Sequence, residues 1–252
     1  SAVSYLYYAD RIYQINLAIA GIAIGTVLLP NLSKHVEQKN IKKINFIQNK
    51  SLELSLFLSL PATFALLISS EQITSALFGY GSFDYLSVKN SADALYFFAI
   101  GLPAFALIKV FSSYIFARHN TKTPFIISIY SVVINIFISL YFFRDLGFII
   151  IPIATTISSW FNALILFIYL IRKKYFFFNK GLIFAIFKIL ISSLISSFLF
   201  YQLIQYSGHL LDYESEYKLL TILLLVTVTF IIYILISIST KAFKISDIKL
   251  KY

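Results

Sequence analysis

Cysteine and methionine are both absent from the 252 residues, and charged side chains are scarce. Without cysteine the chain can form no disulfide, no thiolate metal site and no cysteine nucleophile. Asp, Glu, Lys and Arg make up 13% of the residues, whereas a soluble domain holds roughly a quarter. So few charges cannot cover the apolar residues, which are 59% of the chain with a mean hydropathy of +0.83. Much of the apolar surface is therefore predicted to face lipid.

Signatures of enzymes are also missing from the sequence. It holds no HExxH, P-loop or nucleophile-elbow motif, and no predicted span contains a close pair of carboxylates. The histidines His35, His119 and His209 fall in three different predicted loops, so no two of them are expected to share a site. We expect a protein that is not an enzyme, with no catalytic residues and no bound cofactor.

The start of the chain has neither an initiator methionine nor the features of a signal peptide. Ser1 opens directly into an apolar segment, without a charged region or a small-residue cleavage site. We therefore expect the chain to be a fragment that lacks an N-terminal part.

Seven apolar stretches are long enough to cross a bilayer, whose core requires about 20 residues per helix. They are continuous and not alternating, which favours helices over barrel strands. The predicted fold class is thus an all-α, polytopic membrane helix bundle with seven transmembrane helices. The predicted spans are 2–30, 47–69, 93–116, 124–143, 147–171, 181–206 and 217–239.

Basic loops alternate with acidic or neutral loops along the chain. Loops rich in Lys and Arg stay on the cytoplasmic side of a bacterial inner membrane. This pattern places Ser1 in the periplasm and the C-terminus in the cytoplasm. It also explains the net charge of +10 by membrane topology and not by a nucleic acid partner. The longest predicted loop, 70–92, is too short to fold alone. The basic positions are Lys34, Lys39, Lys42, Lys43, Arg118, Lys122, Arg172, Lys173, Lys174, Lys180, Lys241, Lys244, Lys249 and Lys251.

A stripe of polar and then small residues follows one face of the first predicted span. Residues spaced by three and four lie on the same side of a helix. Two glycines in the inner half form a GxxxG pair, which permits close contact with another helix. The stripe reads Ser4, Tyr7, Arg11, Gln14, Ala18, Gly21 and Gly25.

Arg11 is the most informative residue of this stripe, because an arginine at the centre of a membrane helix costs about 2.5–3.5 kcal/mol to insert. It can reach the outer headgroups or pair with the neighbouring Asp10, but adjacent residues on a helix do not face each other well. We favour a position in a water-filled cavity. There a guanidinium can hold a diphosphate through paired hydrogen bonds.

Other polar residues in the spans leave two interpretations open. Lys109 follows a predicted helix break at Gly101-Leu102-Pro103, and it can line a cavity or extend to the inner interface. Asn135 and a stripe on the following span can line the cavity or coordinate a cation through oxygen atoms. Alternatively, their amides and hydroxyls bond across packed helices. The stripe comprises Pro152, Thr155, Ser159 and Asn162, and Thr155 with Asn135 is the candidate cation site.

Several segments resemble the MurJ (MviN) family of lipid II flippases. The resemblance is strong over about 1–175 and only compositional afterwards. We therefore divide the chain into a core of five helices, 1–175, and a second part, 176–252, with two helices and a basic tail. The segments that carry the resemblance are SYLYYADR at 4–11, GTVLLP at 25–30, LFGYGSFD at 77–84, GLPA at 101–104, Lys109-Val110, and the stretch from Ala117-Arg118 to Thr121-Lys122-Thr123-Pro124.

The resemblance implies a fold of the multidrug/oligosaccharidyl-lipid/polysaccharide exporter superfamily, with fourteen helices in two lobes. This chain would supply helices eight to fourteen, and its partner would be the missing N-terminal lobe. The family moves lipid II, an undecaprenyl-diphosphate-linked disaccharide-pentapeptide, from the inner to the outer leaflet for peptidoglycan biosynthesis. Arg11 matches a cavity arginine of the family and is the expected diphosphate contact. The other candidate substrate residues are Ser4, Asp10, Gln14 and Lys109.

Some alternatives and partners remain open at this point. The coupling of transport to a monovalent cation or to the membrane potential is an expectation without a motif of its own. The last two helices either pack in the lipid or form a groove for the isoprenoid tail. Rival functions are an exporter of other polyprenyl-diphosphate-linked sugars such as O-antigen, a membrane-embedded transferase, and a membrane scaffold that does not transport.

Overall fold

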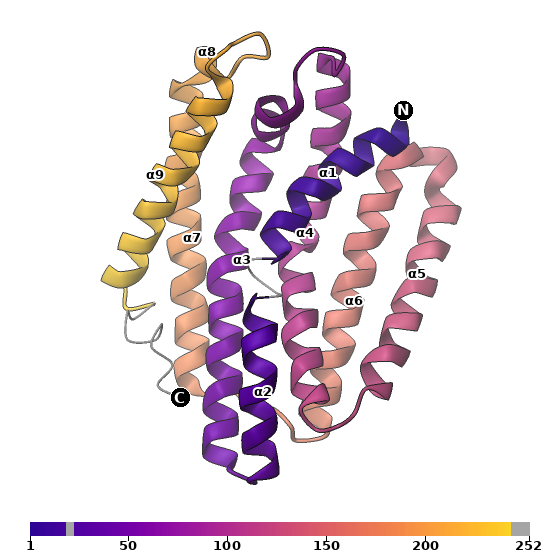
Figure 1. Ribbon diagram of the computed structural model, residues 1–252, viewed down its shortest axis with the longest axis vertical. Helices are drawn as coiled ribbons and strands as arrows, with labels where there is room; N and C mark the ends of the chain where they lie inside the picture. Colours follow the sequence, from indigo (N-terminus) through magenta and orange to yellow (C-terminus); the bar gives the residue numbers. More distant parts are fainter. Residues whose placement is uncertain (19–22, 243–252) are drawn as a thin grey trace.

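The computed structural model describes residues 1–18 and 23–242, and within these ranges the chain forms helices and no strands. Most helices run the length of the molecule and lie side by side (Figure 1). The α-helices are α1 (Ala2–Leu17), α2 (Ala23–Glu37), α3 (Ile41–Phe78), α4 (Tyr85–Phe116), α5 (Lys122–Leu146), α6 (Ile150–Arg172), α7 (Lys180–Tyr206), α8 (Gly208–Leu211) and α9 (Lys218–Ser239), and a 3-10 turn, η2 (Gly147–Ile149), precedes α6.

The all-α membrane bundle is confirmed, but the count of seven helices is not. The predicted first span, 2–30, is described as two helices, α1 and α2. Five stretches of the described residues are long and apolar enough to cross a membrane, by length and composition. One of them, Lys122–Arg172, contains both α5 and α6, which run antiparallel next to each other (Figure 1).

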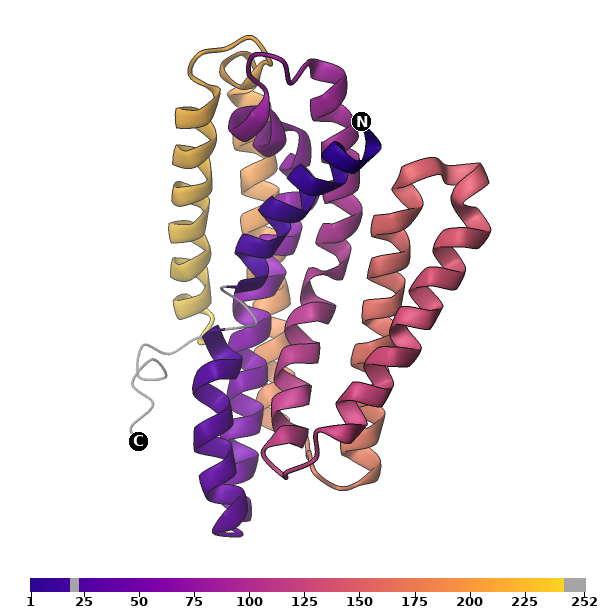
Figure 2. The ribbon, with the colours of Figure 1, turned by 45° about the vertical axis from the view of Figure 1, so that its right-hand side comes forward.

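The connections between helices gather at two ends of the bundle, as the charge pattern predicts. The α2–α3, α4–α5 and α6–α7 connections, which fall in the predicted basic loops, share one end (Figure 1). The α3–α4 connection and α8, beside the acidic residues 212–216, lie at the other end together with Ser1. Figure 2 shows α5 and α9 at opposite edges, with α3 and α4 between them.

The prediction of a loop over 70–92 is wrong, because most of this stretch is helical. Helix α3 continues to Phe78 and α4 begins at Tyr85. The only non-helical backbone inside α3 is at Ser69, with φ −127° and ψ 25°. The Ser69 hydroxyl donates to the Ala65 carbonyl at 2.7 Å, a bond that competes with the helical ladder and bends helices. The chain therefore kinks where the apolar span ends, and the helix then continues through polar residues.

The predicted helix break at Gly101-Leu102-Pro103 is also wrong, since α4 runs through it without interruption. Membrane helices tolerate proline where neighbouring side chains bond to the backbone. Here α6 supplies two such bonds: the Thr156 hydroxyl donates to the Phe97 carbonyl at 2.7 Å, and Trp160 Nε1 donates to the Ile100 carbonyl at 3.1 Å. Contact with α6 thus supports α4 on both sides of Ala99, whose carbonyl lacks its helical donor because residue 103 is proline.

Helices α7 and α9 attach to the bundle along α3. The face of α7 that is buried carries four serines, whose small size permits close approach of helices. The Tyr233 hydroxyl of α9 donates to the Phe57 carbonyl of α3 at 2.7 Å. Their outward faces hold large exposed apolar side chains, as expected for helices in lipid. The buried serines are Ser192, Ser193, Ser196 and Ser197.

Candidate functional site

One side of α1 packs firmly on α4 and α3. Ala9, Ile12 and Tyr13 are buried in an apolar cluster with Leu66 of α3 and residues 94–102 of α4. The Tyr13 ring stacks on that of Phe98 with centroids 5.5 Å apart, and it meets the ring of Phe105 edge-on at 5.4 Å. This packing fixes the rotation of α1, so that positions on its opposite side point away from the helix pair.

The predicted polar stripe lies on the open side of α1. Tyr7, Arg11 and Gln14 are exposed, and Ser4 is half-buried. The Arg11 guanidinium carbon lies 4.8 Å from the centre of the Tyr7 ring, within range of a cation–π contact. Asp10 accepts a hydrogen bond from Gln14 Nε2, and the Ser4 hydroxyl lies 3.0 Å from that of Ser1. The structure therefore brings Ser4, Asp10, Arg11 and Gln14 onto neighbouring turns of one helix.

Arg11 is available to an anionic ligand in this arrangement. Within residues 1–18 and 23–242, no carboxylate forms a salt bridge with it. A guanidinium presents five donors in a planar fork that matches the oxygens of a phosphate. The site can thus hold a phosphate-bearing group beside the exposed Gln14 amide. The glycine pair of the stripe is not part of this geometry, because Gly21 lies outside the described residues and the side-chain surroundings of Gly25 are not described.

Lys109 does not belong to the same cluster as Arg11. It is exposed in the last two turns of α4, near the end of the bundle with the basic connections, whereas α1 covers the other half of α4 (Figure 1). Its carbonyl accepts a hydrogen bond from the Ser113 hydroxyl at 2.9 Å. A role of Lys109 in substrate binding stays a prediction.

Asn135 and Thr155 meet across the α5–α6 hairpin, as the sequence suggested. Asn135 Nδ2 lies 3.1 Å from the Thr155 hydroxyl and 3.4 Å from that of Ser158. The Thr155 hydroxyl in turn donates to the Ile151 carbonyl at 2.7 Å. Both polar groups are engaged in bonds that hold the hairpin together, which is the packing interpretation. The cation site at this pair stays a prediction.

Arg118, which the sequence marked as a basic loop residue and as part of a motif, joins the basic ends of the helices. Its Nη2 donates to the Tyr175 carbonyl at 3.0 Å, its Nη1 donates to the Tyr114 carbonyl at 2.5 Å, and its guanidinium carbon lies 4.4 Å from the centre of the Tyr175 ring. Burial lowers the pKa of the Arg118 guanidinium from its usual value, because the charged form loses water. Arg118 thus joins the end of α4 to the α6–α7 connection.

Lys218, at the start of α9, was missed by the sequence reasoning, which assigned it no role. Its side chain is 2% exposed. Its ammonium donates to the Gly79 carbonyl at 2.7 Å and to the Tyr213 carbonyl at 2.5 Å. It also lies 4.3 Å from the centre of the Tyr80 ring and 4.7 Å from that of Tyr213. Tyr213 lies five residues before Lys218, but Tyr80 and the Gly79 carbonyl are distant in sequence, so no local pattern indicates this site.

Comparisons with known proteins agree on one family. The family model described as "Lipid II flippase MurJ" matches residues 1–222. The chain is 44% identical over 172 residues to a probable lipid II flippase MurJ of Rhizobium meliloti (strain 1021), covering 68% of this chain and 32% of the relative. It is 36% identical over 225 residues to the probable lipid II flippase MurJ of Rickettsia prowazekii (strain Madrid E), covering 89% and 44%.

A solved structure has the same fold. The structure described as "Lipid II flippase MurJ, inward closed conformation" superposes with a TM-score of 0.76 at 26% identity, covering 95% of this chain and 47% of the other. The chain thus spans about a third to a half of the length of these relatives.

Proposed function

The chain belongs to the lipid II flippase MurJ family, and from this membership we propose that it forms one lobe of a flippase for lipid II. The flippase carries this peptidoglycan precursor from the inner to the outer leaflet of the bacterial cytoplasmic membrane by alternating access. It is a transporter and not an enzyme. Its partners are the lipid-linked substrate, the surrounding lipid and a second, N-terminal lobe, in keeping with the greater length of the relatives.

The observation that carries the proposal is the open polar side of α1. The buried side, with Tyr13 between Phe98 and Phe105, holds α1 so that Arg11 stands out from the described helices. An exposed arginine in a helix that belongs to a membrane bundle requires a wet surrounding or an anionic partner. The diphosphate of a lipid-linked sugar supplies such a partner, and Arg11 binds it in the cavity between the two lobes.

The orientation follows from the two ends of the bundle. The end with the basic connections faces the cytoplasm, and the end with Ser1 and α8 faces the periplasm. The division of the molecule at 175 and 176 separates the core, predicted as five helices and built from α1 to α6, from α7 and α9. This core binds the headgroup. These two helices present exposed apolar residues such as Phe184, Phe198 and Leu220 to the lipid, where an isoprenoid tail can lie.

Coupling to a monovalent cation or to the membrane potential is part of the same proposal. The candidate cation ligands are the side chains of Asn135 and Thr155, which meet between α5 and α6. Transport by the reconstituted full-length protein, driven in turn by an ion gradient and by a potential, separates the two sources. A Thr155→Val variant removes the hydroxyl at nearly constant volume, and it lowers only the ion-driven transport if the cation binds here.

Complementation tests the function and the role of Arg11. The full-length protein, its Arg11→Ala variant and its Arg11→Lys variant are expressed in cells depleted of their own lipid II flippase. Arg144→Ala is the matched control, because Arg144 is also exposed but belongs to the last turn of α5 and not to the polar stripe of α1. Loss of charge-assisted bonds to the diphosphate weakens binding by roughly 10- to 100-fold.

The outcomes distinguish the assignment of lipid II as substrate from the role of Arg11. Rescue by the wild type and by Arg144→Ala, with failure of a well-expressed Arg11→Ala, supports both parts of the proposal. Rescue by all variants keeps the flippase and makes Arg11 a structural residue. Absence of rescue by a wild type that reaches the membrane would assign the chain to export of another lipid-linked sugar.

A further inference from the structure

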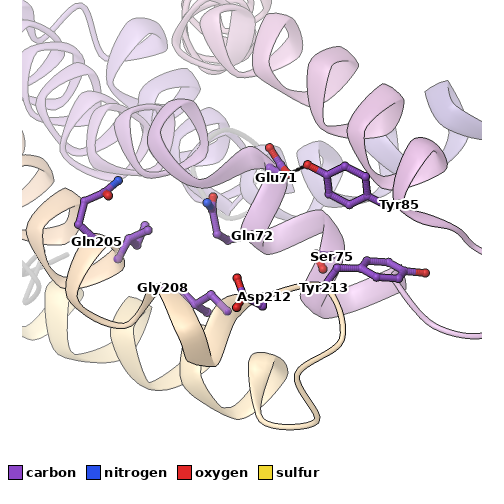
Figure 3. A pocket seen from close by; sticks show the side chains of 10 residues that line it. Glu71, Gln72, Ser75, Tyr85, Gln205, Gly208, Asp212 and Tyr213 are labelled. Atoms are coloured by element: carbon purple, nitrogen blue, oxygen red, sulfur yellow. Dashed lines mark hydrogen bonds between the residues drawn. The ribbon is translucent and has the colours of Figure 1, made fainter.

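A polar pocket lies at the end of the bundle that carries α8, away from the polar side of α1. It has a volume of about 240 Å³ and sits between the end of α3, the start of α4, the end of α7 and α8. Figure 3 shows Glu71, Gln72 and Ser75 of α3 on one side and Gln205, Gly208 and Asp212 on the other. Two segments far apart in sequence, 71–85 and 204–213, thus form one pocket.

The polar atoms of this pocket are mainly oxygen donors of the kind that bind hard cations. Glu71 and Asp212 supply carboxylates, Gln72 and Gln205 supply amide oxygens, and Ser75 supplies a hydroxyl. The residues that line it include no lysine, arginine or histidine. Carboxylate, amide and hydroxyl oxygens with water are the ligands that Ca²⁺ and Mg²⁺ prefer.

The Ser75 hydroxyl is an independent sign that something binds in this pocket. Ser75 is only 4% exposed, lines the pocket, and its Oγ has no hydrogen-bond partner. A buried polar atom without a partner costs roughly 1–3 kcal/mol, and native structures hold few of them. By contrast, Glu71 is already oriented, because its Oε1 accepts a hydrogen bond from the Tyr85 hydroxyl at 2.9 Å.

We propose that this pocket binds a hydrated divalent cation of the Ca²⁺ and Mg²⁺ class from the solution outside that end of the bundle. Glu71 and Asp212 neutralise its charge, and Ser75, Gln72 and Gln205 complete its shell together with water. In the part of the chain that the structure describes, no three Asp, Glu, His or Cys side chains are grouped as at a fully protein-ligated metal site. The ion therefore keeps several waters, for which the volume leaves room.

The bound cation joins α3 to the α7–α8 segment at this end. Its dissociation constant is expected on the order of 10⁻⁴–10⁻³ M, as for calcium sites of extracellular modules. Binding of the cation at this pocket does not depend on whether the protein transports lipid II.

Terbium luminescence provides the test, because Tb³⁺ binds oxygen sites of the calcium type and is excited by nearby tyrosines such as Tyr85 and Tyr213. The full-length protein in nanodiscs of neutral phosphatidylcholine is titrated with Tb³⁺, which is then displaced by Ca²⁺, Mg²⁺, Na⁺ or methylammonium. The test variant combines Glu71→Gln with Asp212→Asn. The control is Asp145→Asn, which removes an exposed carboxylate from the last turn of α5, outside the residues that line the pocket.

The expected result is one saturable site that millimolar Ca²⁺ or Mg²⁺ empties, with affinity about tenfold or more weaker in the double variant and unchanged in Asp145→Asn, since ligand charge sets affinity. Equal luminescence in wild type and double variant overturns the proposal. So does displacement by Na⁺ or methylammonium at the same concentrations. If the double variant fails to fold by gel filtration and circular dichroism, Glu71→Gln and Ser75→Ala decide singly, and unchanged affinity in both refutes the site.

Discussion

The buried ammonium of Lys218 gives the sharpest prediction for stability. Its two carbonyl acceptors belong to the α3–α4 connection and to the segment before α9, so the ammonium joins two parts that are distant in sequence. Each hydrogen bond from a charged donor is worth roughly 1.5–3 kcal/mol, and a desolvated cation–π contact about 2 kcal/mol. Burying the charge costs several kcal/mol and offsets most of these gains.

The Lys218→Met substitution keeps the apolar stem and removes the charge, so the gains and the desolvation cost vanish together. What remains is the loss of the donor by two carbonyls, at roughly 1–3 kcal/mol each. We expect the opening of segment 208–217 to become easier by about 2–6 kcal/mol. At 1.4 kcal/mol per factor of ten, the open population rises by a factor between roughly 30 and 20,000.

Hydrogen exchange of the backbone amides in segments 79–84 and 208–217, followed by mass spectrometry in detergent, measures this opening. Lys180→Met is the control, because it makes the same chemical change at an exposed lysine. Exchange in Lys218→Met that is no faster than in Lys180→Met would show that the ammonium contributes no net stability, and the reasoning above would be refuted.

Two further predictions concern the helix ends and the α4–α6 contact. Hydrogen bonds from Ser87 lower the pKa of Asp84, which caps the start of α4, below its ordinary value of 3.8. The stability that this cap contributes is therefore fully present above pH 3.8 and is lost as the pH falls through the lower pKa of the folded state. Acid unfolding of Asp84→Ala should lack this pH-dependent loss of stability. A Cβ at Gly101 would lie 2.8 Å from the Thr156 hydroxyl, so Gly101→Ala should destabilise the protein by about 1–3 kcal/mol in thermal unfolding. Gly208→Ala is the control, because a Cβ there meets nothing within 4 Å. Equal melting temperatures of the two variants would contradict the close contact at Gly101.

The sequence sufficed for the features that depend on composition along one helix. Hydropathy located the apolar stretches that form α3, α4, α5, α6, α7 and α9, but not the division of 2–30 into α1 and α2. The three-and-four spacing placed Arg11 on the side of α1 opposite the buried Tyr13, which follows from a helix's own periodicity and does not depend on its neighbours. The charge pattern likewise grouped the connections into two ends, because each long helix carries the chain from one end to the other.

Features that depend on contacts between distant residues were missed or wrong. A proline and a glycine at 101–103 predict a break, but Thr156 and Trp160 of α6 support the backbone there. Similarly, the polar residues 70–78 stay helical beyond the membrane span, since a helix that is already nucleated extends at little cost. The site around Lys218 and the pocket at Ser75 both lie between α3 and segments near or after the end of α7. No local sequence pattern predicts a contact between residues so far apart in the chain.

Several connections between distant segments are hydrogen bonds from side chains to backbone carbonyls, and this bears on how the protein responds to salt. Arg118, Lys218 and Asn49 all reach backbone carbonyls of other segments, at Tyr175, Gly79 and Phe177. In the described ranges, the ion pair Lys50–Glu53 lies within a single helix, and the pair of His119 with Glu37 is largely exposed. Carbonyls neither titrate nor attract mobile counterions as carboxylates do. These three connections between segments should therefore hold nearly equally well in dilute and in salty medium.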